Sequence, residues 1–469
     1  MAVAAVSGLI VGGVAVMPSW AASDAKKSRA GSVAAKAAMK VAMKTVVYQG
    51  YELRVPASWP VYRLDKDPST CVRYDIHAVY LGTPGANERC PAGLIGRTQT
   101  VSVIPSTVVA AGSGAEVTFQ RAQPGLTGGT PVRNVPAVRR AIVRNAARRE
   151  LRVALGKAAL GATVIATYGD SSSAVEQVLA SLRSAPRGAR ATAQSAAAAV
   201  PQRAAAPVQP APPPTTPRWQ GVPAGWPTQI VVPPPPPRPR PLQPVSGFDT
   251  CTAPSLPTMK TWRRAYGAIG VYIGGVNSAC AYGNLSASWI RSAAAMGWGM
   301  LPTYVGPQAP CYGYGVMINP KQAAAQGRAA AADAISDAKT FGLGSGTPIY
   351  YDMEAYNASP GSSCVSSVLT FLGAWDREMS ASGFVPAVYS SQDSGIADMQ
   401  AAAQAKAPGF TAPQAVWFAM WDGQRTLSDG SLVWPTAERS KQYQGPQNVT
   451  LGGTTLNIDS DLVAGPLAR

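Results

Sequence analysis

Carboxylates stand at strand ends in the second half of this 469-residue chain. Asp352 and Glu354 close the run TPIYYDME, Asp249 closes SGFDT, and Asp459 and Asp461 lie in LNIDSDL. Residues two apart in a strand point to the same side, so each of the two close pairs can face one cleft. Clustered carboxylates repel, which raises the pKa of one of them and provides a proton donor beside an ionised partner. Glycosidic bond cleavage requires such a pair.

Other chemistries lack the residues that they need. The whole sequence contains one histidine, His77. Ser-His-Asp hydrolysis in the second half and multi-histidine metal sites are therefore excluded, and we expect no metal and no cofactor. A lone histidine without a nucleophile is best interpreted as an ordinary, partly buried residue.

Aromatic residues are frequent near the same strand ends. Their flat faces are natural platforms for sugar rings, although each of them could instead fill the core of the domain. As a group at strand ends they favour a saccharide-binding surface made of Tyr272, Tyr304, Tyr351, Tyr389, Trp417 and Trp421.

Apolar strands alternate with helices over residues 246–468, in about eight repeats with little helix late in the cycle. This order predicts an α/β fold, specifically a (β/α)8-type TIM barrel. The active site of such a barrel lies at the carboxyl ends of its strands. The first and last strands are neighbours in a closed barrel, so we expect Asp249 and Asp459 to lie close together.

The preceding residues, 46–185, predict a small α+β domain. Short β-rich runs broken by Pro and Gly come first, among them TVVYQGYELRVP and TVSVIP. The stretch Val135–Leu155 has apolar residues at steps of three and four with Arg between them, which predicts a basic amphipathic helix. A strand at ATVIATYG and a helix at SSSAVEQVLASLRSA follow, with the serines as its N-cap.

Three further segments carry no folded domain. Residues 1–22 have the apolar run and small-residue end of a signal peptide, although no Lys or Arg precedes Lys26. Residues 23–45 are a polar, basic stem, and residues 186–245 are an Ala- and Pro-rich linker of polyproline II type. We therefore expect a secreted or cell-wall-associated protein without a stable membrane span, and a barrel that folds without its partner domain.

Positive charge is concentrated before the barrel. From Ser246 onward the sequence has 13 Lys+Arg and 14 Asp+Glu, which leaves 28 and 10 for the first 245 residues. The front half therefore carries a charge near +18 and could bind an anionic wall polymer. Arg on ordinary solvated surfaces is the plainer interpretation. Nucleic acid is a poor candidate partner, because the Arg residues are not interleaved with aromatics and the chain carries an export signal.

The six cysteines fit an oxidising compartment. None forms a CxxC pair, so disulfides are the economical interpretation. Cys71 and Cys90 stand alone in the front half and should pair. Cys251 and Cys280 follow adjacent barrel strands, as do Cys311 and Cys364, which predicts these two further bonds.

A specific resemblance covers residues 246–468. The runs GFDTCTAPS, IGVYIGG, LPTYVGPQA, PIYYDMEAY, AVYSS and QYQG…IDSDL resemble the glycoside-hydrolase-like domain of unknown function found in secreted proteins of high-GC Gram-positive bacteria. That domain is similar to the family 25 glycoside hydrolases, the lysozymes that cleave peptidoglycan. The front segment around Cys71 and Cys90 looks like one that often precedes this barrel.

The resemblance implies roles for four carboxylates. Glu354 matches the general acid of the D-x-E motif, and Asp352 matches its partner, either as nucleophile or as orienter of a substrate N-acetyl group. Asp249 and Asp459 match the Asp residues of the first and last strands. The function implied is hydrolysis of cell-wall glycan, and the alternative is a carbohydrate-binding or wall-associated barrel without turnover.

Overall fold

The computed structural model describes residues 41–105, 130–135, 140–146, 148–155, 162–186, 243–427 and 432–469. The expected signal peptide, nearly all of the stem and nearly all of the linker lie outside these residues. No helix in the described ranges is long and apolar enough to cross a membrane.

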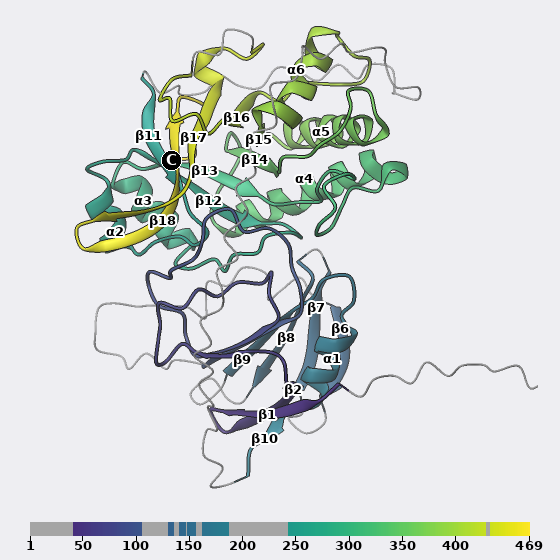
Figure 1. Ribbon diagram of the computed structural model, residues 1–469, viewed down its shortest axis with the longest axis vertical. Coiled ribbons are helices and arrows are strands. Elements are labelled where there is room, and N and C mark those ends of the chain that lie inside the picture. The colour runs from purple at the N-terminus through teal and green to yellow at the C-terminus, as the bar shows by residue number, and fades with distance from the viewer. Residues whose placement is uncertain are drawn as a thin grey trace, which may run out of the picture. The chain divides into compact units, whose positions relative to one another are not determined.

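The front residues form two sheets (Figure 1). The smaller has the order β1-β2-β10, with bounds Met43–Tyr48, Tyr51–Pro56 and Arg183–Ser184. Gln49 and Gly50 join its first two strands with φ of 50° and 75°, the backbone of a tight hairpin turn that favours glycine. The larger sheet has the order β3-β4-β5-β9-β8-β7-β6. Its strands, in that order, are Val61–Arg63, Ala78–Leu81, Thr100–Pro105, Ala162–Thr167, Glu150–Leu155, Arg140–Asn145 and Thr130–Val135.

The helix predicted over Val135–Leu155 is wrong. The stretch contains β7 and β8, an antiparallel pair whose register joins Val143 to Arg152. Leu151, Val153 and Leu155 point alternately into the core. Arg149, with a positive φ of 47°, lies in the turn between the two strands. The period of two therefore decides the structure over the apparent helical spacing. The second expected helix is present as α1, Ser173–Ala180. Its N-cap residue Ser172 makes no side-chain cap bond, because its hydroxyl donates to Glu176.

The second half is a closed barrel of eight strands, β11 to β18 in sequence order. Their bounds are Val245–Asp249, Ala268–Gly274, Gly299–Tyr304, Pro348–Met353, Val385–Ser391, Ala415–Ala419, Arg439–Leu451 and Thr454–Val463. One α-helix follows each of the first five strands: α2 Leu256–Trp262, α3 Ala287–Ala295, α4 Ala323–Thr340, α5 Ser363–Ala381 and α6 Ala397–Gln404. The mixed α/β class and the barrel's closure are therefore as expected.

The last third of the barrel departs from the expected repeat. Strands β11 to β17 are parallel, but β18 is antiparallel to both of its neighbours, β17 and β11. A two-glycine turn at Gly452 and Gly453 joins β17 to β18, so no helix fits between them. The described residues between β16 and β17 hold only a short 3-10 helix, Thr436–Glu438. The run of eight parallel βα units predicted from sequence is thus wrong for the final strand.

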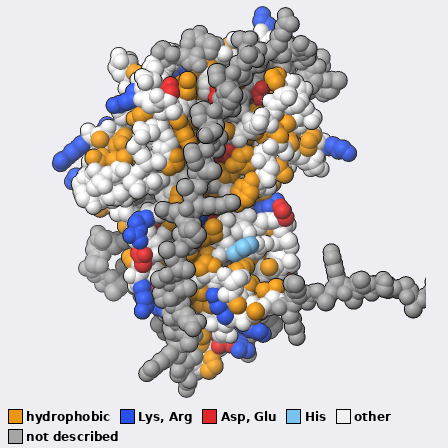
Figure 2. Space-filling view, viewed as in Figure 1, with side chains coloured by type: hydrophobic (Ala, Val, Ile, Leu, Met, Phe, Trp, Pro, Cys, Tyr) orange, Lys and Arg blue, Asp and Glu red, His pale blue; other side chains and the backbone are white. Residues whose placement is uncertain are grey.

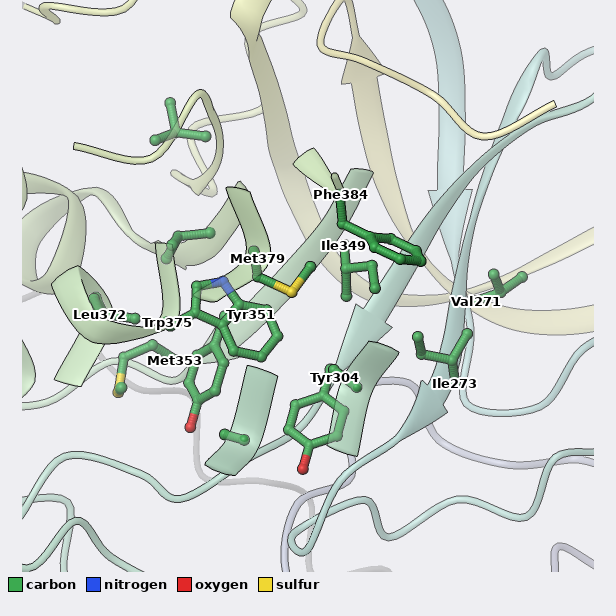
Figure 3. Packing of buried hydrophobic residues seen from close by; sticks show 14 of the residues in the cluster. Val271, Ile273, Tyr304, Ile349, Tyr351, Met353, Leu372, Trp375, Met379 and Phe384 are labelled. Carbon is green, nitrogen blue, oxygen red and sulfur yellow. The ribbon is translucent and has the colours of Figure 1, made fainter. Parts of the chain in front are cut away.

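Strand alternation divides the buried residues of the barrel into two cores. Residues such as Ile273, Tyr304 and Tyr351 face the helices, where Tyr351 packs against Trp375 with ring centroids 4.9 Å apart (Figure 3). The barrel interior is smaller and contains Ala268, Leu301, Tyr350, Ala387, Ala415, Trp417 and Val463. The residues that face inward near the carboxyl ends of the strands therefore lie above an apolar interior.

All three predicted disulfides are present: Cys71–Cys90, Cys251–Cys280 and Cys311–Cys364. The second holds the loop after β11 against the loop after β12. The third joins the loop after β13 to the first turn of α5, the helix that follows β14. Both of the barrel's own bonds therefore connect segments that follow the carboxyl ends of its strands.

The front residues also contact the barrel directly. Tyr74 N donates to Ala279 O at 2.8 Å, and Gly96 N donates to Asn277 O at 2.7 Å. Ala92 N donates to Asn457 Oδ1 at 2.9 Å. The described residues of the two halves therefore contact each other around the Cys71–Cys90 disulfide, and folding of the barrel without its partner domain stays a prediction.

Candidate functional site

Five carboxylates gather at the carboxyl ends of the barrel strands. Asp249 is the last residue of β11 and is paired in register with Asp459 of β18, as predicted from closure of the barrel. Asp461 is opposite Gly247 and so lies deeper, because β18 runs antiparallel. Asp352 lies in β14, and Glu354 directly follows that strand. Glu354 is partly exposed, whereas the other four carboxylates are 0–3% exposed.

Asp352 and Glu354 lie close enough together for each carboxyl to perturb the pKa of the other. Gln308 fixes the backbone on both sides of this pair. Its Nε2 donates to Asp352 O at 2.8 Å, and its Oε1 accepts from Glu354 N at 2.8 Å. Gln308 is fully buried, and sequence reasoning missed it. Its place in the run LPTYVGPQA, just after β13, was the available signal.

Burial raises the pKa of every carboxyl in the cluster. It raises the pKa of Asp352 well above its usual range, and the Glu354 and Asp249 charges add to this effect. The pKa of Glu354 is raised to about 7 by burial and by Asp249. The pKa of Asp249 is raised to about 6, with hydrogen bonds from Gln442 and Tyr272 holding it down. Among the described residues no Lys or Arg bonds these carboxyls, so the cluster keeps protons near neutral pH.

Gln442 of β17 connects the carboxylates to aromatic residues. Its Nε2 donates to Asp249 Oδ2 at 2.9 Å and to Asp459 Oδ2 at 3.3 Å. Its Oε1 accepts from Tyr389 OH at 3.0 Å and from Trp421 Nε1 at 2.8 Å. Sequence reasoning missed Gln442 as well, although it lies in the quoted run QYQG. One amide thereby sets the positions of two carboxylates and two rings.

The six predicted saccharide-binding aromatics separate into three groups. Tyr272, Tyr389 and Trp421 are bonded to the cluster: Tyr272 OH donates to Asp249 Oδ1 at 3.2 Å, and the other two bond Gln442. Trp421 is 55% exposed and rests on Gly445, so one of its faces is open. Trp417 is 2% exposed inside the barrel and donates from Nε1 to Asp461 Oδ1 at 3.1 Å.

Tyr304 and Tyr351 belong to the helix-facing core and not to the mouth (Figure 3). Tyr304 OH donates to Asp333 Oδ2 at 2.8 Å, and Tyr351 OH donates to Pro307 O at 2.6 Å. The prediction used only their place at strand ends, but the alternation of the strands puts Tyr304 and Tyr351 on the outer side. We therefore remove these two residues from the candidate saccharide surface.

Gly270 of β12 provides the space that Asp249 occupies. A Cβ at this position would lie 2.6 Å from the Asp249 Cβ and 3.1 Å from Trp417 Cη2. Any side chain here would displace the first-strand carboxylate or the interior indole. This glycine therefore belongs to the construction of the site.

The front segment reaches the rim of the cluster. A Cβ at Gly93 would lie 3.9 Å from Asp459 Oδ2, and one at Gly96 would lie 2.6 Å from the ring of Tyr314. Tyr314, in the loop after β13, is 51% exposed. Nearby Tyr312 feels the charges of Glu354 and Asp352, which add to the effect of burial in raising its pKa. Residues outside the barrel thus border the candidate site, which the sequence did not indicate.

One group of the described residues has the spacing of metal ligands: Cys71, Glu88 and Cys90. Its two sulfur atoms are joined in a disulfide, so they cannot act as thiolate ligands. Burial raises the pKa of Glu88 to about 8, and its Oε2 accepts from Val72 N at 2.7 Å. The group is a buried structural contact and not a metal centre.

Comparison with known proteins supports the resemblance noted from sequence. Residues 260–463 match the family of Rv2525c-like, glycoside hydrolase-like domains. An uncharacterized B. stearothermophilus protein is 16% identical with a TM-score of 0.34, over 46% of this chain and 95% of its own. The modular autolysin LytC from Streptococcus pneumoniae is 14% identical with a TM-score of 0.30, over 47% of this chain and 46% of its own. A GH18 chitinase from Pseudoalteromonas aurantia is 9% identical with a TM-score of 0.26, over 42% of this chain and 78% of its own. No curated protein matches the chain.

Proposed function

We propose that this glycoside-hydrolase-like barrel cleaves glycosidic bonds of bacterial cell-wall glycan by acid catalysis. The observation that carries the proposal is the close pair of Asp352 and Glu354 at the end of β14, whose pKa values perturb each other, together with three more carboxylates. Glu354 is the one member that is partly exposed. It can therefore meet a substrate oxygen while the buried members control its proton.

Glu354 is the proposed proton donor. Its pKa of about 7 leaves much of it protonated at neutral pH, unlike an ordinary glutamate. Transfer of this proton to the glycosidic oxygen allows the bond from the anomeric carbon to that oxygen to break. Asp352 stays closer to the barrel interior and retains its own proton more strongly, because it is more deeply buried.

The shared strand end of Asp352 and Glu354 bears on the second half of the reaction. Direct attack by a carboxylate in a retaining enzyme uses carboxyl groups about 5–5.5 Å apart, so that each meets a different side of the bond. Asp352 and Glu354 are two residues apart at the end of β14 and so approach the bond from the same side. We therefore assign Asp352 to orientation of a substrate N-acetyl group, whose carbonyl oxygen bonds the anomeric carbon as the leaving group departs. Water then opens this cyclic intermediate and returns a proton to Glu354.

Trp421 is the proposed platform for a sugar ring, with Tyr272 and Tyr389 beside it. Its open face and its bond to Gln442 place an apolar surface next to Asp249 and Asp459. Each of Asp352, Asp459 and Asp461 also has one buried carboxyl oxygen without a hydrogen-bond partner among the described residues. The Asp459 oxygen is suited to a sugar hydroxyl, because Asp459 borders the mouth.

Glu354→Gln tests the proposal, because it keeps the shape of the side chain and removes the transferable proton. Release of reducing ends from purified peptidoglycan should fall by about a hundredfold or more. Binding to the same glycan should remain. Glu378→Gln, on the outer helix α5, is the matched control and should retain full turnover. Asp352→Asn should also abolish turnover, whereas Asp249→Asn should weaken it less.

A glycan-binding barrel without turnover is the second candidate. The observation that favours it is the deep burial of four of the five carboxylates, which limits their access to substrate. If the wild-type protein binds wall glycan or chitin oligomers but releases no reducing ends from either, this candidate replaces the hydrolase.

The front half is proposed to hold the protein at the wall through anionic polymer, on the strength of its charge near +18. On the face drawn in Figure 2, Lys and Arg side chains of the described residues stand at separate points and not in one patch. Diffuse attraction of this kind is weakened by salt. The disulfides fit the secreted location that this role needs.

A further inference from the structure

A cavity of about 580 Å³ lies between the seven-stranded sheet and the barrel, away from the carboxylate cluster. We propose that it binds a small amphiphile, with an apolar body of about ten carbons and one carboxylate head. None of the five cluster carboxylates lines it, so the inference stands apart from the proposed glycosidase activity.

The wall on the sheet side follows from strand alternation. Leu151 and Val153 of β8 turn into the core of the sheet domain, which sends Glu150 and Arg152 to the opposite face. Ile165 of β9 pairs in register with Arg152 on one side and with Ser102 of β5 on the other. A row of Ser102, Ile165 and Arg152 therefore faces the cavity.

The remaining walls are mostly apolar and come from both parts of the chain. The barrel provides residues of α2 and α3 and of the loop before α3, and the sheet domain provides its own aliphatic side chains. These apolar lining residues include Leu64, Val72, Ile104, Leu256, Leu285 and Trp289. A space of this size and lining matches the cavities that bury small organic ligands.

One end of the cavity is polar and incompletely bonded. Arg152 Nε bonds Glu150, but Arg152 Nη1 is buried without a hydrogen-bond partner among the described residues. The hydroxyl of Ser102, beside it across Ile165, is also buried and has no partner among these residues. Arg152 is 7% exposed, so water from the surface reaches it poorly. Two buried donors thus point to an acceptor that the described part of the chain does not supply.

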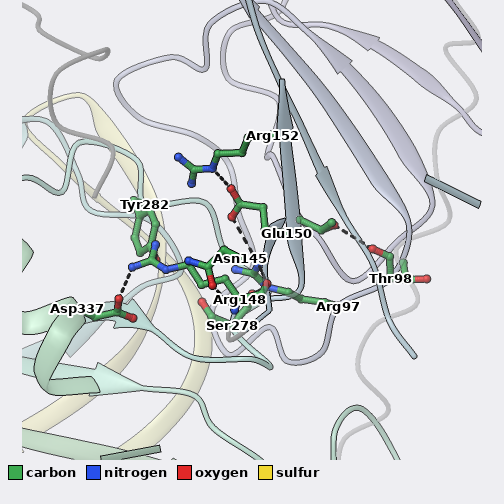
Figure 4. A network of polar contacts seen from close by, with 10 residues as sticks. Arg97, Thr98, Asn145, Arg148, Glu150, Arg152, Ser278, Tyr282 and Asp337 are labelled. Carbon is green, nitrogen blue, oxygen red and sulfur yellow. Dashed lines mark hydrogen bonds and ion pairs between the residues drawn. The ribbon is translucent and has the colours of Figure 1, made fainter. Parts of the chain in front are cut away.

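Arg97, the other cationic residue of the lining, is already bonded. Its Nε donates to Ser278 O at 2.7 Å, and its Nη1 donates to Arg148 O (Figure 4). Glu150 lies between the two guanidinium groups, at 3.9 Å from Arg97 Nη1. The charged residues of the lining are therefore two arginines and one glutamate. This balance favours an anion over a neutral or cationic head, and a guanidinium fork favours a carboxylate.

Calorimetric titration of the full chain with decanoate, below its micelle concentration, tests the inference. We expect one binding site per chain. Decan-1-ol has the same apolar body without the charge and should bind at least about tenfold more weakly, since a charge-assisted hydrogen bond is lost. Absence of decanoate binding at millimolar concentration, or equal affinity for the acid and the alcohol, would overturn the proposal.

Variants of α3 locate the binding. Ser292 lines the cavity and is partly exposed, so Ser292→Trp should fill the space without disturbing the sheet and should weaken decanoate binding at least about tenfold. Ala295→Trp, on the same helix but exposed and outside the lining, is the matched control and should bind like the wild type. Unchanged binding by Ser292→Trp would show that decanoate binds elsewhere.

Variants of the polar end identify the head group's partners. Arg152→Met should bring the affinity for decanoate down to that for decan-1-ol. Ser102→Ala removes a hydroxyl that has no partner among the described residues, so the variant should fold normally. It should still weaken the binding of decanoate more than the binding of decan-1-ol. It keeps the inference falsifiable if Arg152→Met does not fold. Equal weakening of both ligands by Ser102→Ala would argue against a carboxylate at this end.

Discussion

Asp461 is fully buried in the barrel, and the one hydrogen bond to its carboxyl among the described residues comes from the Trp417 indole. Burial, with Asp249 and Asp459 nearby, raises its pKa well above the usual range. The folded protein therefore keeps a proton that the unfolded chain releases as the pH rises above about 4. The contribution of Asp461 to stability is present in acid and is lost as the pH increases.

Asp461→Asn should remove this loss, because an amide keeps the acceptor for Trp417 and does not ionise. We expect the variant to be more stable than the wild type at pH 8 by about 1 kcal/mol or more, since a tenfold change in proton affinity is worth about 1.4 kcal/mol. The difference should shrink towards pH 4. Urea unfolding at several pH values measures it, and a variant less stable than the wild type at pH 8 would contradict the assignment.

Gln308 is a positioning residue at the same scale. Its two hydrogen bonds hold the backbone of Asp352 and Glu354, so Gln308→Leu should misplace the acid without removing it. We expect kcat on wall glycan to fall about tenfold to a hundredfold, with KM little changed, because small displacements of reacting groups are costly. The pH at which activity is half-maximal should also shift. Gln308→Glu keeps the acceptor for Glu354 N but loses the donor to Asp352 O. Its kcat should therefore stay below that of the wild type.

Residue type determined which members of the site could be predicted from sequence. Asp249, Asp352 and Glu354 are charged residues at strand ends, a place where charge needs an explanation. Gln308 and Gln442 are neutral amides, and nothing in their spacing separates them from surface glutamines. Tyr350 is two residues before Asp352 and shares its side of the strand, whereas Tyr351 lies on the opposite side. The alternation that directs Asp352 to the mouth could therefore have assigned Tyr351 to the helix side from the sequence.

At the scale of elements, local pattern predicted most of the barrel and failed where tertiary pairing decided. Alternating strand-like and helix-like sequence patterns predict β11 to β16 and α2 to α6. The antiparallel β18 is set by a turn of two glycines and by the space left between β17 and β11. Val135–Leu155 satisfies helical spacing, but β8 pairs with β9 on one side and β7 on the other, and sheet pairing overrides propensity there.

The Cys251–Cys280 disulfide joins the loop after β11 to the loop after β12, next to Asp249. It spans 29 residues, and a loop of that length stabilises by about 3–4 kcal/mol through restriction of the unfolded chain. Replacement of both cysteines by alanine should lower the free energy of unfolding by this amount. Guanidinium unfolding of the variant and the wild type measures the difference. A loss below about 1 kcal/mol would mean that the loops after β11 and β12 are held by their other contacts.

At the scale of the whole molecule, the sheet domain and the barrel share a buried polar interface. Arg148 of the β7–β8 turn bonds Asp337 of α4 and the hydroxyl of Tyr282 (Figure 4). Both charged side chains are at most 5% exposed. Sequence separated the two domains because a Pro-rich linker stands between them. A linker, however, reports only how the chain passes from one domain to the next, and not whether their surfaces meet.

Breaking this ion pair from one side should be costly. Arg148→Met leaves Asp337 buried without its cation, which typically destabilises by about 3–5 kcal/mol. Adding Asp337→Asn removes the uncompensated charge, so the double variant should recover a substantial part of that loss. Urea unfolding of the wild type, the two single variants and the double variant gives the comparison. If the two substitutions are simply additive in residues 41–469, the arginine and the aspartate do not interact in solution.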